Sequence, residues 1–379
     1  MIVVIPVCDE PDICRTLNSL AGCHQPSCAV EVLVVINHSE KSQRSVVEQN
    51  EKTYRELLSL TALSAFPFSL KVIFAGALPS KHAGVGWARK IGLDEGVRHF
   101  NRLDRPDGLL ISLDADTLVS PAYFEIIEAA FDEFHPPGIT LAFKHRMDEL
   151  TSVRQREGIF FYEAYLHYYR SALAYCGYPH AIYTIGSAFA VRADAYVKVG
   201  GMSRRQAGED FYFLHKLTQL GIVRHSPQLC VFPSARISNR VPFGTGPAIK
   251  KWMEGDESLR YTYCLQAFCD LKYLFDSLAE WWSTRNQTLI TEKHALAVQI
   301  FWKQGNWDDE LKNIVFNCSS FLNFKKRFFQ KFSAFQVIRF LNESHDYFYQ
   351  REPLSEAIAR LGKYDAELVA WVKGFPKKN

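Results

Sequence analysis

The segment MIVVIPVCDEPDICRTLNSLAG, residues 1–22, contains a predicted strand followed by a predicted helix. Residues 2–7 are apolar and rich in β-branched side chains, which is typical of a strand that is buried on both faces. An acidic cap and Pro11 then favour the start of a helix. Apolar side chains at helical spacing continue until Gly22, which ends the helix. The chain therefore opens with a strand–helix unit.

The same alternation continues through the first half of the chain. Further strands are predicted at 30–36, 70–75, 109–113 and 140–143. Helices are predicted at 84–100 and 121–134, and a charged helix after the second strand ends near residue 60. Repeated strand–helix–strand units predict an α/β fold with a parallel sheet covered by helices. Beyond these units we expect a helix at 154–177, a strand at 182–191, a helix at 209–220 and a strand at 222–232.

A Gly- and Pro-rich stretch, RVPFGTGP at residues 240–247, is predicted to be a loop. We place the domain boundary there, which gives a first domain at 1–240 and a mostly helical, aromatic-rich region at 241–379. In that region Phe side chains recur at three- and four-residue steps, with Lys and Arg around them. This pattern predicts an amphipathic helix that packs on the protein or rests on an anionic membrane.

The composition excludes several classes of protein. The chain has 379 residues, of which 47% are hydrophobic and 22% charged, so it is neither disordered nor fibrous. A net charge of +3 is too small to indicate nucleic acid as a partner. Nine cysteines without a CxxC pair indicate reduced thiols. With no positively charged leader and no long apolar run, we expect a cytoplasmic protein.

Polar residues follow the predicted strands where ligands bind in such sheets. The first strand ends at Pro6 and Val7, the second at Asn37, and the fourth is followed by Asp114 and Asp116. Because ligands bind beyond the carboxyl ends of parallel strands, we expect these residues to face one crevice. Asn37 suits the edge of a base or ribose there, although a simple turn residue is the alternative.

Two carboxylates in the stretch Leu113-Asp114-Ala115-Asp116 would repel each other unless a cation lies close by. A divalent metal would offset that cost, and oxygen ligands suit Mg²⁺ or Mn²⁺. The alternative is a turn in which Asp116 bonds backbone amides or caps the next helix.

Two further groups have both a catalytic or binding reading and a structural one. Glu209 and Asp210 follow Gly208 at a predicted helix start, where one carboxylate could act as a general base or both could complement the helix dipole. Arg89 lies in a Gly-containing stretch that allows close backbone approach. It could reach an anionic oxygen or lie in solvent at the helix end.

The order of these segments resembles the inverting family 2 glycosyltransferases with a GT-A fold. Six segments carry the resemblance, over about residues 1–235: VVIPVCDEP (3–11), EVLVVINHS (31–39), GVGWARKIGLDEG (84–96), ISLDADTLVSPAYF (111–124), TIGSAFAVRADAYVKVGGM (184–202) and AGEDFYFLHKL (207–217). The fourth resembles the family's L-D-x-D motif, and the last its E-D motif. The resemblance implies a Rossmann-like, mostly parallel sheet with helices on both faces, plus a helical C-terminal domain.

The resemblance also implies roles for individual residues. Asp210, with Glu209 beside it, would be the catalytic base. Asp116 would coordinate Mn²⁺ or Mg²⁺, and Asp114 would approach the ribose and the metal. The nucleotide-sugar site would include Pro6, Val7, Asp9, Asn37, Arg89, Asp114, Ala115 and Gly186. Arg240 is a further candidate, either as a phosphate clamp or as part of an ordinary linker.

Two departures from the family pattern stand out. Asn37 replaces an acid, which leaves the identity of the nucleotide base open. Many relatives carry a metal-facing His after the E-D helix, whereas ARISNR at residues 235–240 has Ser238 and Asn239 in that region. Asp116, phosphates and water alone would then hold the metal. His225 could substitute as a ligand, and a surface histidine is the alternative.

The expected activity is transfer of a hexose from a UDP- or GDP-linked donor to a hydroxyl of a glycan, a lipid-linked or a small-molecule acceptor. It would proceed by metal-assisted single displacement with inversion. The alternatives are a retaining transferase of the same fold, a sugar nucleotidyltransferase, or a catalytically dead nucleotide-sugar-binding protein. Peripheral contact with the inner face of a membrane, through the C-terminal region, is a further expectation.

Overall fold

The computed structural model describes residues 1–205, 208–238, 244–284 and 289–375. The chain forms two compact units, and neither is a continuous piece of chain. The first unit contains residues 1–159 and 182–251, and the second contains residues 160–181 and 252–379. The boundary expected at residue 240 therefore differs from the observed division, because the second unit also takes most of one helix from the middle of the chain.

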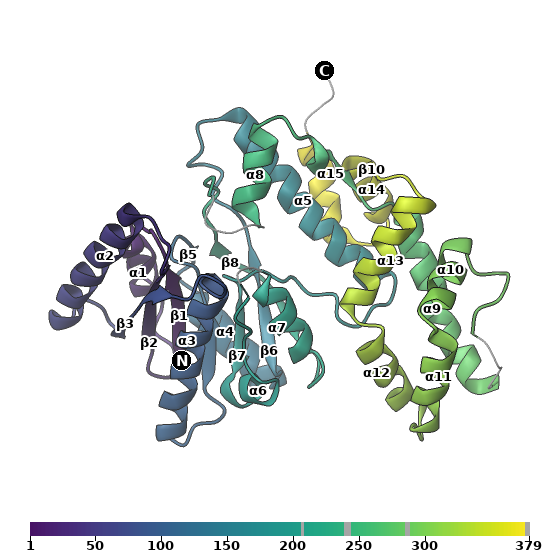
Figure 1. Ribbon diagram of the computed structural model, residues 1–379, viewed down its shortest axis with the longest axis horizontal. Helices are drawn as coiled ribbons and strands as arrows, with labels where there is room; N and C mark the ends of the chain where they lie inside the picture. The colour runs from purple at the N-terminus through teal and green to yellow at the C-terminus, as the bar shows by residue number, and fades with distance from the viewer. Residues whose placement is uncertain (206–207, 239–243, 285–288, 376–379) are drawn as a thin grey trace. The chain divides into compact units, whose positions relative to one another are not determined.

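The first unit is built on an eight-stranded sheet (Figure 1). Its strands are β1 (Ile2–Val7), β2 (Glu31–Ser39), β3 (Ser69–Leu78), β4 (Leu109–Ser112), β5 (Leu118–Val119), β6 (Gly138–Phe143), β7 (Phe189–Arg192) and β8 (Arg224–Phe232). They are arranged in the order β3-β2-β1-β4-β7-β6-β8-β5. Strands β3, β2, β1 and β4 run parallel, and β6 is parallel to β8. Strand β7 is antiparallel to both β4 and β6, and β5 is antiparallel to β8.

Helices cover both faces of this sheet. They are α1 (Ile13–Ala21), α2 (Arg44–Ala62), α3 (Val85–Arg102), α4 (Tyr123–Phe134), α6 (Ala193–Lys198) and α7 (Glu209–Leu217). Helix α8 (Thr245–Met253) follows β8 in the chain and begins in the first unit. Ile2 and Val4 pack in one buried cluster with side chains of α3, α6 and α7. Val3 and Ile5 point to the opposite face and are equally buried. The apolar run of β1 is thus explained by burial on two faces, and the predicted α/β architecture is confirmed.

The boundaries also show where local pattern fails. Strand β7 is much shorter than the predicted strand at 182–191, and β5 was not expected. Six of the seven predicted strands agree with the structure to within three residues at each end: β1, β2, β3, β4, β6 and β8. Short strands carry little sequence signal, because two to four residues show no clear period.

The second unit is helical, as expected. Helix α5 (Val153–Tyr175) begins in the first unit and continues into the second. The other elements are η1 (Ser258–Arg260), β9 (Tyr261–Thr262), α9 (Leu265–Thr284), α10 (Leu296–Gln304), α11 (Trp307–Phe316), α12 (Phe321–Lys331), α13 (Ala334–Tyr347), β10 (Glu352–Pro353), α14 (Leu354–Leu361) and α15 (Ala366–Gly374). Strands β9 and β10 form a short antiparallel pair.

Aromatic rings form much of the interior of the second unit. The single amphipathic face expected from Phe321 onward is divided between α12 and α13, which are separated by Phe332 and Ser333. Phe324 and Phe328 are buried, and their rings contact those of α9 and of each other. The packing alternative therefore accounts for this apolar face. Within the described residues, no helix combines the length and apolar character that crossing a bilayer requires.

Candidate functional site

The carboxyl ends of three neighbouring parallel strands form the edge where the sequence places the site. Strand β1 pairs with β2 up to Val7 and with β4 up to Ser112. The Leu113 N–H donates to the carbonyl of Val4 at 3.1 Å, which continues the pairing one residue beyond β4. The turn that contains Asp114 and Asp116 therefore lies beside the end of β1.

The side chain of Asn37 links the ends of β1 and β2 by a hydrogen bond, and its amide group does not point outward. Its side-chain Nδ2 donates to the carbonyl of Val7 at 3.0 Å, and the whole residue is buried. Asn50, on α2, donates to the backbone carbonyl of Asn37 at 2.8 Å and accepts from the N–H of Asp9 at 2.9 Å. Asp9 has φ of 52°, so this bond supports a strained backbone. Sequence reasoning missed Asn50; an Asn on the sheet-facing side of a helix was the only available signal.

Arg89 lies between two carboxylates. The guanidinium pairs through Nη2 with Asp114 and through Nη1 with Glu209, and Arg89 as a whole is only 3% exposed. We call Arg89, Asp114 and Glu209 the Arg89 cluster. Burial alone would lower the pKa of Arg89, but Asp114, Glu209 and Asp210 raise it above its ordinary value. The arginine therefore stays charged, and its two hydrogen-bonding arms are directed at protein carboxylates.

Two glycines allow this cluster to form. A Cβ on Gly186 would lie 2.3–2.6 Å from guanidinium atoms of Arg89, which is too close for any side chain. The Ser112 hydroxyl donates to the Gly186 carbonyl at 2.7 Å and fixes that segment against β4. A Cβ on Gly86 would lie 2.2 Å from the carbonyl oxygen of Arg205. Gly186 was expected at the nucleotide sugar, and the structure places it against Arg89.

Beside this cluster, the carboxyl group of Asp210 has a strongly shifted pKa. Burial and the negative charge of Glu209 together raise the pKa of its carboxyl to about 7, while Arg89 opposes the shift. The Phe211 N–H donates to Asp210 Oδ1 at 2.7 Å. Unlike Glu209, which is buried, Asp210 keeps partial exposure at the first turn of α7. A carboxyl with a pKa near 7 can accept and release a proton at neutral pH.

The turn between Asp114 and Asp116 is held from two sides. The Thr117 N–H donates to the Asp114 carbonyl at 3.1 Å and closes the turn. The hydroxyl of Thr16, on α1, donates to the carbonyl of Ala115 at 2.7 Å. The two acidic side chains then lead to different arginines, with Asp114 on Arg89 and Asp116 on Arg236.

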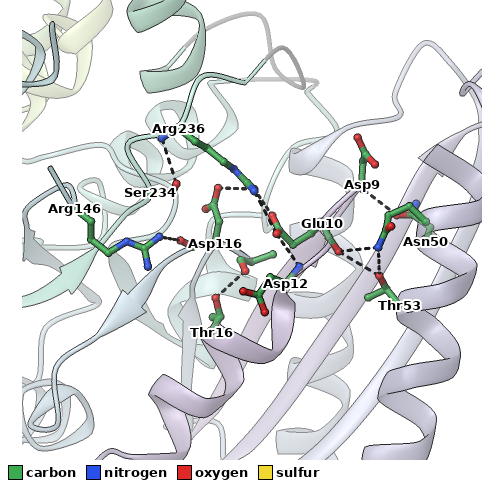
Figure 2. Close-up of polar contacts among 12 residues, drawn as sticks. Asp9, Glu10, Asp12, Thr16, Asn50, Thr53, Asp116, Arg146, Ser234 and Arg236 are labelled. Atoms are coloured by element: carbon green, nitrogen blue, oxygen red, sulfur yellow. Dashed lines mark hydrogen bonds and ion pairs between the residues drawn. The ribbon is translucent and has the colours of Figure 1, made fainter. Parts of the chain in front are cut away.

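Arg236 forms a second centre of charge around Asp116. Figure 2 shows its guanidinium between Asp116 and Glu10, with Arg146 on the far side of Asp116. Arg236 Nη2 lies 2.8 Å from Asp116 Oδ2, and Arg236 Nη1 donates to Glu10 Oε1 at 3.3 Å while Nη2 also bonds Oε2. Arg146 Nη2 donates to the backbone carbonyl of Asp116 at 2.9 Å. We call Glu10, Asp116, Arg146 and Arg236 the Arg236 cluster.

Short strand pairings bring these residues together. Strand β5 runs antiparallel to β8 with Leu118 opposite Phe232, so the chain just before β5 lies beside the chain just after β8. The Arg146 N–H donates to the carbonyl of Pro233 at 3.2 Å and continues the pairing of β6 with β8. Neither Arg236 nor Arg146 was predicted from the sequence.

The residues present do not fit a divalent metal at Asp116. Within residues 1–205, 208–238, 244–284 and 289–375, no three His, Cys, Asp or Glu side chains are grouped so as to hold a metal ion. The Asp116 carboxylate already contacts a guanidinium at 2.8 Å, and a second arginine bonds its carbonyl. A dication added there would be close to two positive charges. The expectation of Mn²⁺ or Mg²⁺ stays a prediction.

The remaining predicted site residues lie in different surroundings. Pro6 and Val7 are buried within β1. His225, the substitute metal ligand, has its Nδ1 3.1 Å from the Thr140 hydroxyl and its ring centre 4.8 Å from that of Tyr183. Arg240 and Asn239 lie outside the described residues.

Comparison with solved structures finds several similar chains. Staphylococcus aureus TarS in complex with UDP-GlcNAc has a TM-score of 0.42 and 13% identity, over 86% of this chain and 89% of that chain. The mannosyltransferase PcManGT from Pyrobaculum calidifontis, in complex with GDP-Man and Mn²⁺, has a TM-score of 0.39 and 12% identity, over 91% and 86%. GalNAc-T7 with UDP, GalNAc and Mn²⁺ has a TM-score of 0.40 and 13% identity, over 89% and 58%.

This chain is thus similar in structure to glycosyltransferases, as the sequence resemblance suggested. No family model and no curated protein matches the sequence.

Proposed function

We propose that this chain is a glycosyltransferase that moves a sugar from a nucleotide-diphosphate donor to an acceptor hydroxyl, with inversion at the anomeric carbon. The observation that carries the proposal is the state of Asp210. Its carboxyl has a pKa raised to about 7 by burial and by Glu209, and it lies in the first turn of α7 beside the Arg89 cluster. A general base works best when its pKa lies near the operating pH.

In the proposed step, Asp210 accepts the proton of the acceptor hydroxyl. The freed oxygen forms a bond to the anomeric carbon from one face of the sugar, while the bond to the diphosphate oxygen breaks on the opposite face. The electron pair of the broken bond leaves with the diphosphate. Asp210 Oδ1 is held by the Phe211 N–H, and we assign proton transfer to the other oxygen.

The Arg89 cluster supports this base by position. Arg89 fixes Glu209, the residue next to Asp210, and ties the start of α7 to the turn that carries Asp114. Because Arg89 bonds both Asp114 and Glu209, the first turn of α7 is held in a fixed position relative to this edge of the sheet. The donor is proposed to lie at this edge, beyond β1 and β2, with UDP or GDP as its nucleotide and a hexose as its sugar.

Calorimetry with UDP and GDP, combined with a donor-cleavage assay, tests the proposal. The assay mixes the full chain with a panel of UDP- and GDP-hexoses and follows release of free UDP or GDP. We expect Asp210→Asn to bind the nucleotide as the wild type does but to lose about 10²–10⁴-fold in cleavage. Asp107→Asn is the control, because this exposed residue lies just before β4, at the opposite edge of the sheet.

The outcomes separate the competing activities. Failure of both nucleotides to bind would remove the donor site, and full activity of Asp210→Asn would remove the base. Retention of the anomeric configuration in the product, followed by NMR, would favour a retaining transferase. Release of pyrophosphate in a reaction with a nucleoside triphosphate would favour a nucleotidyltransferase. Binding without any turnover would favour a dead nucleotide-sugar-binding protein.

The acceptor and the location stay predictions. We keep the hydroxyl of a glycan, a lipid-linked or a small-molecule acceptor as the acceptor class and the cytoplasm as the location. Lys325, Lys326 and Arg327 are exposed on α12, so peripheral contact with an anionic membrane is also kept. Sedimentation of the full chain with anionic and neutral vesicles tests that contact.

A further inference from the structure

The Arg236 cluster places a protein cation on the carboxylate that the sequence assigned to a metal. Arg236 bridges Asp116 and Glu10, and Arg146 bonds the Asp116 carbonyl. We propose that Arg236, supported by Arg146, supplies the positive charge for the donor diphosphate, so that nucleotide binding does not require a divalent ion. This inference rests on the proposed function, because it assumes a nucleotide-diphosphate donor.

Glu10 explains why Arg236 stays in this place. The carboxylate of Glu10 is only 2% exposed, and a buried carboxylate needs a counter-charge. Arg236 supplies it through bonds to both Glu10 oxygens. The Asp12 N–H also donates to Glu10 Oε1 at 3.2 Å. The backbone of Glu10 is held in turn by α2, because the Thr53 hydroxyl donates to its carbonyl at 3.2 Å (Figure 2).

The exposure of Arg236 makes its charge available to a ligand. Its side chain is 33% exposed, and that of Asp116 is 30% exposed. A guanidinium does not lose its proton in proteins, so Arg236 is a permanently charged group with an accessible side. Guanidinium groups match phosphate oxygens in geometry as well as in charge.

The charges around Asp116 also work against a dication. Arg236 Nη2 lies 2.8 Å from the carboxylate, and Arg146 Nη2 donates to the backbone carbonyl of the same residue at 2.9 Å. A metal bound to Asp116 would compete with Arg236 for the same carboxylate. A diphosphate, in contrast, adds a partner for the guanidinium and leaves the bonds to Glu10 in place.

The test is calorimetric titration of UDP and GDP into the full chain, once in EDTA and once with excess Mn²⁺. We expect the wild type to bind one of the nucleotides with the same Kd in both buffers. Arg236→Gln is expected to weaken that binding about 10- to 100-fold, the loss typical of a hydrogen bond to a charged group. Arg105→Gln is the matched control, because this arginine pairs with Asp107 at the opposite edge of the sheet.

A second variant separates binding from folding. Arg236→Gln leaves Glu10 buried without its partner, whereas the double variant Glu10→Gln with Arg236→Gln removes both charges. If Arg236 binds the diphosphate, the single and double variants lose the same affinity while thermal unfolding shows both to be folded. Recovery of wild-type affinity in the double variant would overturn the inference, because it would show that Arg236 acts only through Glu10.

The inference and the proposed function fail in different ways. Nucleotide binding that appears only with Mn²⁺ would overturn this inference and leave the proposed function standing. Unchanged affinity in Arg236→Gln would do the same. Failure of UDP and GDP to bind in either buffer would overturn the proposed function, and this inference with it.

Discussion

The Arg89 cluster and the Arg236 cluster each hold an arginine between two carboxylates, and they are joined by the turn from Asp114 to Asp116. Arg89 lies between Asp114 and Glu209, and Arg236 between Asp116 and Glu10. The difference between them is access to water. The side chain of Arg89 is 4% exposed and that of Arg236 is 33% exposed.

This difference assigns different work to two similar groups. The guanidinium of Arg89 is buried, and both of its terminal nitrogens bond protein carboxylates, so its charge is balanced within the fold. Arg89, on α3, thereby connects the turn after β4 with α7. An arginine that is anchored on one side and open on the other can receive a ligand. The bonding partners of a charged side chain and its exposure to water have to be considered together before a role is assigned to it.

Replacing Arg89, the buried arginine of the two clusters, is expected to have the largest effect on stability. Arg89→Met is expected to lower the free energy of unfolding by about 3–5 kcal/mol, because Glu209 would stay buried without a counter-charge. Denaturant unfolding measures the change. Arg105→Met, at an exposed pair, is the control and should unfold at the same denaturant concentration as the wild type. A loss below about 1 kcal/mol for Arg89→Met would mean that the cluster opens to water.

Adding one methyl group tests the packing under Arg89. Gly186→Ala would place Cβ 2.3–2.6 Å from the guanidinium, so Arg89 would have to shift away from Asp114 and Glu209. We expect a loss of about 1–3 kcal/mol in the free energy of unfolding. Gly221→Ala is the control, because a Cβ there meets only ordinary contacts at 3.6 Å or more and, as at Gly186, the backbone has no positive φ. A loss in Gly186→Ala no larger than that in Gly221→Ala would show that the overlap is relieved without cost.

The pH profile of donor cleavage sharpens the role of Asp210. With a pKa raised to about 7 by burial and Glu209, the base loses activity as the pH falls below 7, by about tenfold per pH unit. For stability the sign is opposite. The folded protein binds this proton more tightly than the unfolded chain, so the contribution of Asp210 to stability falls as pH rises from about 4 to 7.

Two measurements check these signs. The rate of nucleotide release between pH 5 and 9 should show a limb near pH 7, which disappears in Asp210→Asn. The difference in unfolding free energy between Asp210→Asn and the wild type should grow in favour of the variant over the range from pH 4 to 7. A wild-type rate that is flat down to pH 5 would contradict the assignment of Asp210 as the base.

The smallest loss of stability is expected for Arg236, the more exposed of the two arginines. Arg236→Gln should lower the free energy of unfolding by about 1 kcal/mol, less than Arg89→Met, because Arg236 is partly exposed to water and Glu10 keeps the hydrogen bond from the Asp12 N–H. Chemical denaturation of both variants side by side gives the ratio. Equal losses would show that both arginines are structural to the same degree.

Much of the fold follows from pattern in the sequence. The apolar runs of β1 and β2 and the glycine-rich start of α3 predicted a sheet of parallel strands with the site at its edge, and the structure has this sheet. Buried parallel strands have a strong signal because both faces must be apolar. The antiparallel insertion of β7 had no such signal, since it depends on pairing between distant segments.

The site shows the same limit at the level of single residues. Asp114, Asp210 and Arg89 were named from motifs, and the structure brings them into one neighbourhood. Which of them faces a ligand was not predictable, because the partner of Arg89 is Glu209, 120 residues away in the chain. Arg236 was missed for the same reason, since its place depends on the two-residue pairing of β5 with β8.

Helix α5 decides how this protein can be taken apart in the laboratory. Its first turns belong to one unit and the rest to the other, so no single cut yields two intact halves. A recombinant fragment that stops at residue 251 would keep Tyr168 but lose the Tyr263 carbonyl that accepts its hydroxyl at 2.9 Å. It would also expose the buried ring of Phe161, and aggregation would follow. A workable catalytic fragment has to bridge residues 159 and 182 with a short polar linker.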